Sequence, residues 1–149
     1  MAVTAEFEIT IARSAPDVFA HLVDLARYPE WLVASGILRA ELLAPAPAAG
    51  APLRIEQRVA GRSATLEGAI TAYEPASRFA FRAKHPEGIT VDVDAFLTPD
   101  GSMSRLRWSV RVGLPLKYRF FEGMLRPQMQ SAAAADLERF RTRLQSVAG

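Results

Sequence analysis

The sequence contains no cysteine, which excludes disulfide bonds, thiolate metal ligands, iron–sulfur clusters and cysteine nucleophiles. Histidine occurs only twice, at His21 on a predicted helix and His85 beside a predicted turn, so we expect no metal site and no other cofactor. No apolar run approaches the ~18 residues of a transmembrane helix, and residues 1–8 alternate polar and apolar side chains instead of forming a signal peptide. We therefore expect a cytoplasmic protein with no integral membrane association.

The chain also lacks a large excess of either charge, because its formal net charge is only +2. Its arginines are scattered among acidic residues and are not gathered on one face with aromatic side chains, as in proteins that bind nucleic acid. Arg139, Arg141 and Arg143 form the one dense group, near the end of a predicted helix, where cations interact favourably with the helix dipole. We expect no nucleic-acid partner.

What is present is typical of a globular protein, with 50% hydrophobic and 23% charged residues in 149. This length suits one core, and we expect a single domain over residues 1–149. Alternation predicts a strand over residues 3–11. The motif SAPD at residues 14–17 then predicts a short helix, capped by the hydroxyl of Ser14, and Tyr28-Pro29 ends this helical region.

Turn residues divide the middle of the chain into six further strands. Their predicted spans are 36–43, 53–59, 62–73, 78–84, 89–97 and 103–112. Short connections favour an antiparallel meander. After Pro115 the apolar period becomes helical and predicts a long helix over residues 118–147, with Gly123 and Pro127 disturbing its first turns.

Alternation along these strands predicts an inner face that is almost wholly apolar. Its predicted members are Leu38, Ala40, Leu42, Leu53, Ile55, Val59, Phe79, Phe81, Ala83, Val91, Val93, Leu97, Leu106, Trp108, Val110 and Val112. Asp92 and Asp94 fall on the opposite face and are expected to meet solvent. Gln57 is the clearest polar residue inside, either as a hydrogen-bonded core amide or as a group that orients a ligand.

The order of elements resembles the helix-grip fold of the START, Bet v 1 and polyketide cyclase superfamily, and the resemblance covers essentially the whole chain. It extends to SAPDVF at residues 14–19, DLARYPEW at 24–31, YEP at 73–75 and LTPDG at 97–101. The resemblance implies an α+β protein in which a curved seven-stranded antiparallel sheet wraps around a long C-terminal helix, with two short helices after the first strand. It also implies a cavity between sheet and helix for a lipid, a polyketide or another apolar molecule.

We accordingly expect a protein that binds a hydrophobic small molecule. The alanines at residues 132–135 would leave space opposite the sheet, although alanine is also simply the best helix former. Trp31 can form the entrance or serve as a packing anchor. The expected ligand-binding residues are Trp31, Gln57, Tyr73, Phe79, Phe81, Trp108, Phe121, Leu125, Met129 and Ala133.

Two other functions stay open. A polyketide cyclase or dehydratase would need a buried acid or base, for which Tyr73, Tyr118, His21 and Gln57 are the candidates, and none lies in a catalytic motif. A protein-interaction module would use the outer face of the sheet. The sequence defines neither the ligand nor the catalytic residues nor the oligomeric state.

Overall fold

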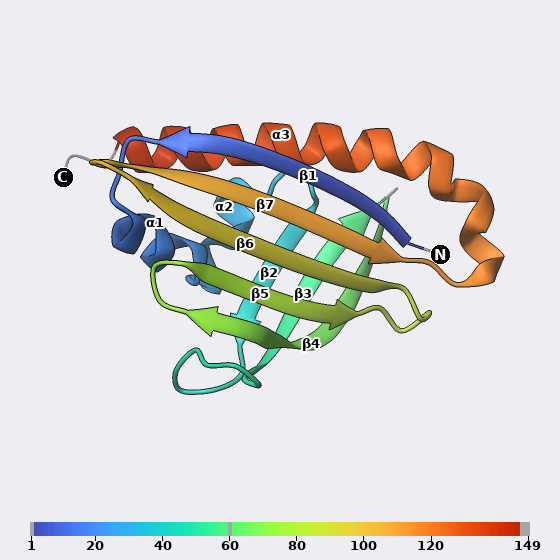
Figure 1. Cartoon of the computed structure of the whole chain (residues 1–149). Coiled ribbons are helices and arrows are strands. Elements are labelled where there is room, and N and C mark those ends of the chain that lie inside the picture. The colour runs from blue at the N-terminus through green and yellow to red at the C-terminus, as the bar shows by residue number, and fades with distance from the viewer. Residues whose placement is uncertain (1, 60, 147–149) are drawn as a thin grey trace.

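In the computed structural model, which describes residues 2–59 and 61–146, seven strands form one curved antiparallel sheet around a long C-terminal helix (Figure 1). The strands are β1 (Ala2–Ile11), β2 (Ile37–Leu42), β3 (Pro52–Val59), β4 (Arg62–Glu74), β5 (Arg78–Lys84), β6 (Thr90–Asp100) and β7 (Met103–Gly113). Their order is β1-β7-β6-β5-β4-β3-β2, a meander closed by the pairing of the first strand with the last. The predicted helix-grip fold is confirmed.

The helices occupy two regions. After β1 come α1 (Ala15–Leu22), the 3-10 turn η1 (Leu25–Arg27) and α2 (Tyr28–Trp31), and after β7 come the 3-10 turn η2 (Leu116–Phe121) and α3 (Glu122–Ser146). The long helix therefore begins as a 3-10 turn, and its predicted last residue, Val147, lies outside the described residues. In the described part of the chain, no helix is long and apolar enough to cross a membrane.

Three local expectations were wrong. A register shift between Ile37 and Arg39 interrupts the alternation of β2, so Leu38 is exposed, and Val59 is exposed at the last position of β3. Ser14 does occupy the N-cap position of α1, but its hydroxyl makes no capping hydrogen bond. The acid of that motif, Asp17, instead accepts a 2.6 Å hydrogen bond from Nε of Arg13.

The expected outward position of Asp92 and Asp94 is confirmed. Asp92 accepts a 2.7 Å hydrogen bond from Arg82, and Asp94 accepts a 2.8 Å hydrogen bond from Arg78 on the neighbouring strand. Arg82 and Asp92 are directly opposed on β5 and β6, whereas Arg78 reaches Asp94 diagonally, because Asp94 is opposite Ala80. Opposite charges on the outer face stabilise strand pairing, which leaves the inner face free for apolar contacts.

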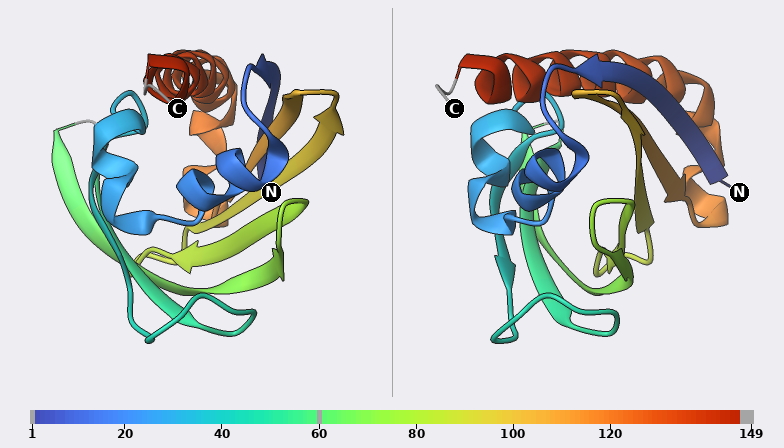
Figure 2. Two further views of the ribbon diagram at one scale, coloured as in Figure 1. Left: turned by 90° about the vertical axis from the view of Figure 1, so that its left-hand side faces the viewer. Right: turned by 60° about the vertical axis from the view of Figure 1, so that its left-hand side comes forward.

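The helices cover the concave face unequally. Figure 2 shows α3 lying along β1 across the open side of the sheet, while α1 and α2 cover one end of it. The buried residues of α3 come from its second half: Ala133, Asp136, Leu137, Phe140 and Leu144. The core is consequently concentrated at the end of the sheet beside α1 and α2.

Gly68 permits the backbones of β4 and β5 to approach closely. A Cβ built at this position would lie 1.7 Å from the carbonyl oxygen of Arg82 and 2.7 Å from Cα of Ala83, both backbone atoms. No L side chain fits there unless the two strands move apart. Close approach of two backbones is one of the few requirements that only glycine meets inside a strand.

We therefore expect Gly68→Ala to lower the free energy of unfolding by at least about 3 kcal/mol, because a backbone clash cannot relax as a side-chain clash does. Gly123→Ala is the matched control, since nothing lies within 4 Å of its added Cβ. In the first turn of α3 that change should be neutral or stabilising by up to about 1 kcal/mol. Urea denaturation measures both, and a Gly68→Ala protein as stable as the parent would contradict this role.

Candidate functional site

Aromatic side chains fill the end of the interior beside α1 and α2. The ring centroid of Trp31 lies 4.4 Å from that of Phe140 on α3 and 5.4 Å from that of Trp108 on β7. Tyr28 packs edge-on against Trp31 at 5.3 Å and lies 6.3 Å from Phe81 on β5. All of these rings are buried. We call this region the packed end.

Tyr28 contributes a satisfied polar group to the packed end. Its hydroxyl donates a 2.5 Å hydrogen bond to the carbonyl oxygen of Leu22. Burial, together with the nearby carboxylate of Asp24, raises the pKa of Tyr28 above its ordinary value. The phenol therefore stays neutral and acts as a packing group that also fixes the end of α1.

The rest of the concave face is less evenly covered, because Val3 and Ala5 on β1 are buried whereas other inner-face residues are not. Phe7, Ala64, Val91 and Val110 pack against the core from β1, β4, β6 and β7, yet each is only partly buried. Leu125 and Met129 on α3 are also only partly buried. We call these six residues the open end.

The register fixes the direction of these side chains. Val110 pairs with Val93 across β6 and β7 and lies two residues from Trp108, so all three share the inner face. The side-chain amide of Gln130 donates a 2.9 Å hydrogen bond to the carbonyl oxygen of Glu6, which holds this part of α3 against β1. Solvent thus reaches apolar side chains that point into the concave face.

A buried carboxylate connects α3 to the loop after α2. Asp136, only 1% exposed, accepts hydrogen bonds from the backbone N–H groups of Ala34 at 2.7 Å and Ser35 at 3.0 Å. It also accepts a 2.6 Å bond from the Ser35 hydroxyl and a 3.1 Å bond from Arg139. Burial raises the pKa of the Asp136 carboxyl, and these four donors oppose that shift. The donors fully occupy the two carboxylate oxygens.

The same loop reaches the sheet through Gln57. Its side-chain amide donates a 2.8 Å hydrogen bond to the carbonyl oxygen of Ser35, the residue that binds Asp136. A continuous polar connection therefore runs from α3 through the loop to β3. Gln57 acts here as a hydrogen-bonded amide, one of the two roles that its position in the sequence predicted.

Apart from Gln57 and Tyr73, the structure separates the expected ligand-binding residues into three groups. Trp31, Phe79, Phe81, Trp108 and Ala133 are buried at or beside the packed end, and the burial of Ala133 leaves no accessible space next to its methyl group. Leu125 and Met129 belong to the open end. Phe121 is 54% exposed on η2, because a 3-10 turn has a different period from the α-helical stripe that predicted its position.

The candidate acid–base residues do not converge. Tyr73 is partly buried beside α1, with its ring 5.5 Å from that of Phe19. The Tyr118 hydroxyl donates to Glu87 on an exposed turn, His21 lines a surface pocket, and Gln57 is bonded to Ser35. Among residues 2–59 and 61–146, no three His, Asp or Glu side chains gather as metal ligands.

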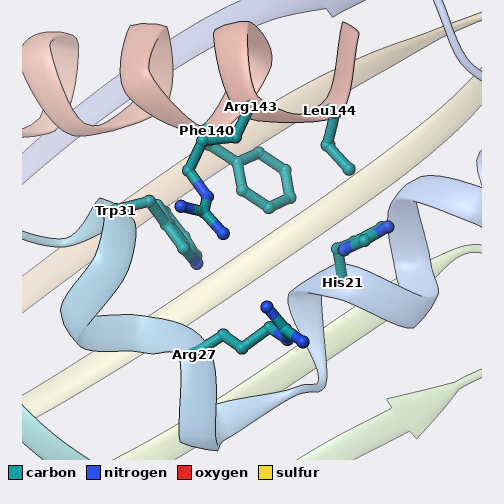
Figure 3. A pocket seen from close by; sticks show the side chains of 6 residues that line it. All are labelled: His21, Arg27, Trp31, Phe140, Arg143 and Leu144. Carbon is teal, nitrogen blue, oxygen red and sulfur yellow. The ribbon is translucent and has the colours of Figure 1, made fainter. Parts of the chain in front are cut away.

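The surface pocket around His21 is too small for an organic ligand. It has a volume of about 40 Å³ and is lined by His21, Arg27, Trp31, Phe140, Arg143 and Leu144 (Figure 3). Both of its arginines pair with acids: Glu30 lies 2.5 Å from Arg143 and 3.6 Å from Arg27, and Asp24 lies 3.3 Å from Arg27. This volume holds little more than a water molecule, so the pocket is the outer surface of the packed end.

Asp136 is the site-forming residue that sequence reasoning missed. Its position falls on the buried stripe of α3, three residues after Ala133 and four before Phe140. An acidic residue at a core position of an amphipathic helix is a usable signal, because a buried charge needs partners. Those partners, two consecutive backbone N–H groups in a loop, are not visible in the sequence.

Comparison with known proteins agrees with this architecture. The family model described as polyketide cyclase/dehydrase and lipid transport matches residues 2–145. A START superfamily protein from Mycobacterium smegmatis is 15% identical, with a TM-score of 0.80 over 97% of this chain and 99% of that one. The ZhuI aromatase/cyclase from a Streptomyces species is 16% identical, with a TM-score of 0.75 over 97% of this chain and 94% of that one.

A protein from Thermus thermophilus is similar to the same extent, with 16% identity and a TM-score of 0.77 over 98% of this chain and 99% of that one. None of the curated proteins matches the chain in sequence. At these identities the solved structures show a shared fold and nothing finer.

We expect Asp136→Ala to lower the free energy of unfolding by about 3 kcal/mol, because the two N–H groups of Ala34 and Ser35 and the Ser35 hydroxyl lose the buried acceptor that they share. Asp136→Asn keeps one acceptor oxygen and should cost less. Glu138→Ala is the control: this exposed acid on the same helix pairs with Arg141, and its loss should change stability by less than about 0.5 kcal/mol. Equal effects of the two alanine variants in urea denaturation would refute the special role of Asp136.

Proposed function

Since this chain belongs to the polyketide cyclase/dehydrase and lipid transport family, we propose that it binds an apolar small molecule at the open end. One observation carries the proposal: Phe7, Val91 and Val110 point into the concave face beside a buried core, yet solvent reaches them. Apolar surface accessible to water inside a concave face gains free energy when a ligand covers it.

The composition of the open end favours an apolar ligand. Its six residues are all apolar, and the nearest polar side chain on the inner face, Gln57, already donates to Ser35. Burial of apolar surface releases about 25 cal/mol per Å², so micromolar affinity needs few hydrogen bonds. A lipid chain, a polyketide or another molecule rich in hydrocarbon meets this requirement.

Binding without turnover is the function that the arrangement supports best. A cyclase or dehydratase requires an acid or base within reach of the bound chain. Here the one partly buried phenol that faces the core, Tyr73, lies beside α1, and the buried rings of Phe79 and Phe81 follow it along the sheet toward the open end. We therefore favour a carrier, sensor or chaperone for the ligand over an enzyme.

The proposal is tested by filling the open end. Val110→Trp should abolish binding of the neutral fluorescent probe N-phenyl-1-naphthylamine and leave the thermal transition nearly unchanged, because the indole occupies accessible space. Ser109→Trp is the matched control, since the neighbouring residue on β7 pairs with Glu6 and Asp94 on the outer face. That variant should bind the probe as the parent does.

Two outcomes would count against the proposal. If Val110→Trp loses about 1–3 kcal/mol of stability, the space is already packed and the indole overfills it. If the parent protein binds no probe at micromolar concentrations, the open end does not serve as an apolar binding site.

A further inference from the structure

The connection between β7 and α3 exposes large apolar side chains that nothing in the described chain covers. Leu116 is 75% exposed and Phe120 is 80% exposed, and Phe121 and Met124 are also exposed. Leu116, Phe120 and Phe121 lie on η2 and Met124 lies in the first turn of α3, so the exposed side chains come from one short segment. Contiguous exposed apolar side chains mark a surface that meets a partner or a membrane.

Basic side chains accompany this apolar group. Lys117 lies over the ring of Tyr118 and Arg119 over the ring of Phe120, each at 5.0 Å from the ring centroid, and Arg126 follows on α3. In the described part of the chain, none of these three cations forms an ion pair with a carboxylate. By contrast, Arg105 and Arg107 on the outer face of β7 both pair with Glu8.

The charge of this segment is unbalanced. Residues 116–126 carry three basic side chains and one acidic side chain, Glu122, a surplus of two that equals the formal net charge of the entire chain, +2. The other nearby acid, Glu87, accepts a 3.0 Å hydrogen bond from the Tyr118 hydroxyl and ties the segment to the turn between β5 and β6. The surface is therefore both apolar and cationic.

Its position in the fold brings this surface next to the open end. Figure 1 shows η2 and the start of α3 at the end of the sheet opposite α1, close to the start of β1. The next turns of α3 carry Leu125 and Met129, which belong to the open end. A molecule entering or leaving the open end would pass close to the exposed segment.

We propose that residues 116–126 dock the protein on an anionic lipid bilayer. The exposed side chains of Leu116, Phe120 and Met124 enter the boundary between headgroups and acyl chains, and Lys117, Arg119 and Arg126 bind the anionic headgroups. Aromatic and aliphatic side chains beside unpaired cations are the features of segments that lie in this interface. The docking surface goes beyond the proposed ligand binding and does not depend on it.

Co-sedimentation with vesicles tests this proposal. The parent protein should bind vesicles of phosphatidylcholine containing about 30% phosphatidylserine, bind pure phosphatidylcholine much more weakly, and lose binding as salt is raised. The double variant Phe120→Ser, Phe121→Ser and the double variant Lys117→Glu, Arg119→Glu should each bind the anionic vesicles at least about tenfold more weakly.

The matched controls lie at the other end of the sheet. Met103→Ser removes an exposed apolar side chain and Arg105→Glu reverses an exposed charge, and both variants should sediment with vesicles as the parent does. The two docking variants should still bind N-phenyl-1-naphthylamine, which separates a failure of docking from a failure of ligand binding. Unchanged thermal transitions confirm that they fold.

Three results would overturn the proposal: no binding of the parent protein to anionic vesicles, equal binding by the docking variants, or equal loss in the controls. A dimer in sedimentation velocity that dissociates in the Phe120→Ser, Phe121→Ser variant, without vesicle binding, would instead assign the exposed segment to contact between two copies of the chain.

Discussion

The position of α3 depends on one buried carboxylate. This helix packs on β1 at the edge of the sheet, and Asp136 fixes its other side to the loop after α2 by accepting three hydrogen bonds from Ala34 and Ser35. The carbonyl oxygen of Ser35 also accepts a hydrogen bond from Gln57, so the helix is joined to β3 across the open side of the sheet. A buried carboxylate is unfavourable without hydrogen-bond donors. The charge of Asp136 therefore favours the loop conformation that supplies these donors.

This attachment allows the two ends of the interior to differ. At the packed end, the ring of Trp31 packs against those of Phe140 and Trp108. Burial of these large aromatic surfaces stabilises the fold. Two attachments hold α3: its packing at the packed end, and the hydrogen bond from Gln130 to Glu6 on β1. The first half of the helix therefore does not need to cover the sheet. Phe7, Val91 and Val110 can then remain partly accessible. The packed end thus stabilises the fold, and the open end is left for the proposed ligand.

The strands and the fold were predictable from the sequence because turn residues separate the strands and most strands alternate polar and apolar residues, which also gave the outward position of Asp92 and Asp94. The predicted side-chain positions were wrong where local geometry changes the repeat of the backbone. A bulge exposes Leu38, and a 3-10 turn exposes Phe121. The sequence did not reveal the role of Asp136, because its donors depend on how the loop after α2 folds. For the same reason it did not reveal that the Ser14 hydroxyl makes no capping hydrogen bond. The division of the apolar residues into a packed and an open end depends on where α3 lies, which no alternation pattern reveals.

Native mass spectrometry of the purified protein is the sharpest test of whether the open end accommodates an apolar molecule. We expect a species heavier than the bare chain by one small molecule, which organic extraction recovers and which is replaced when N-phenyl-1-naphthylamine is added. A spectrum that shows only the bare chain, both as purified and after incubation with that probe, would contradict the claim.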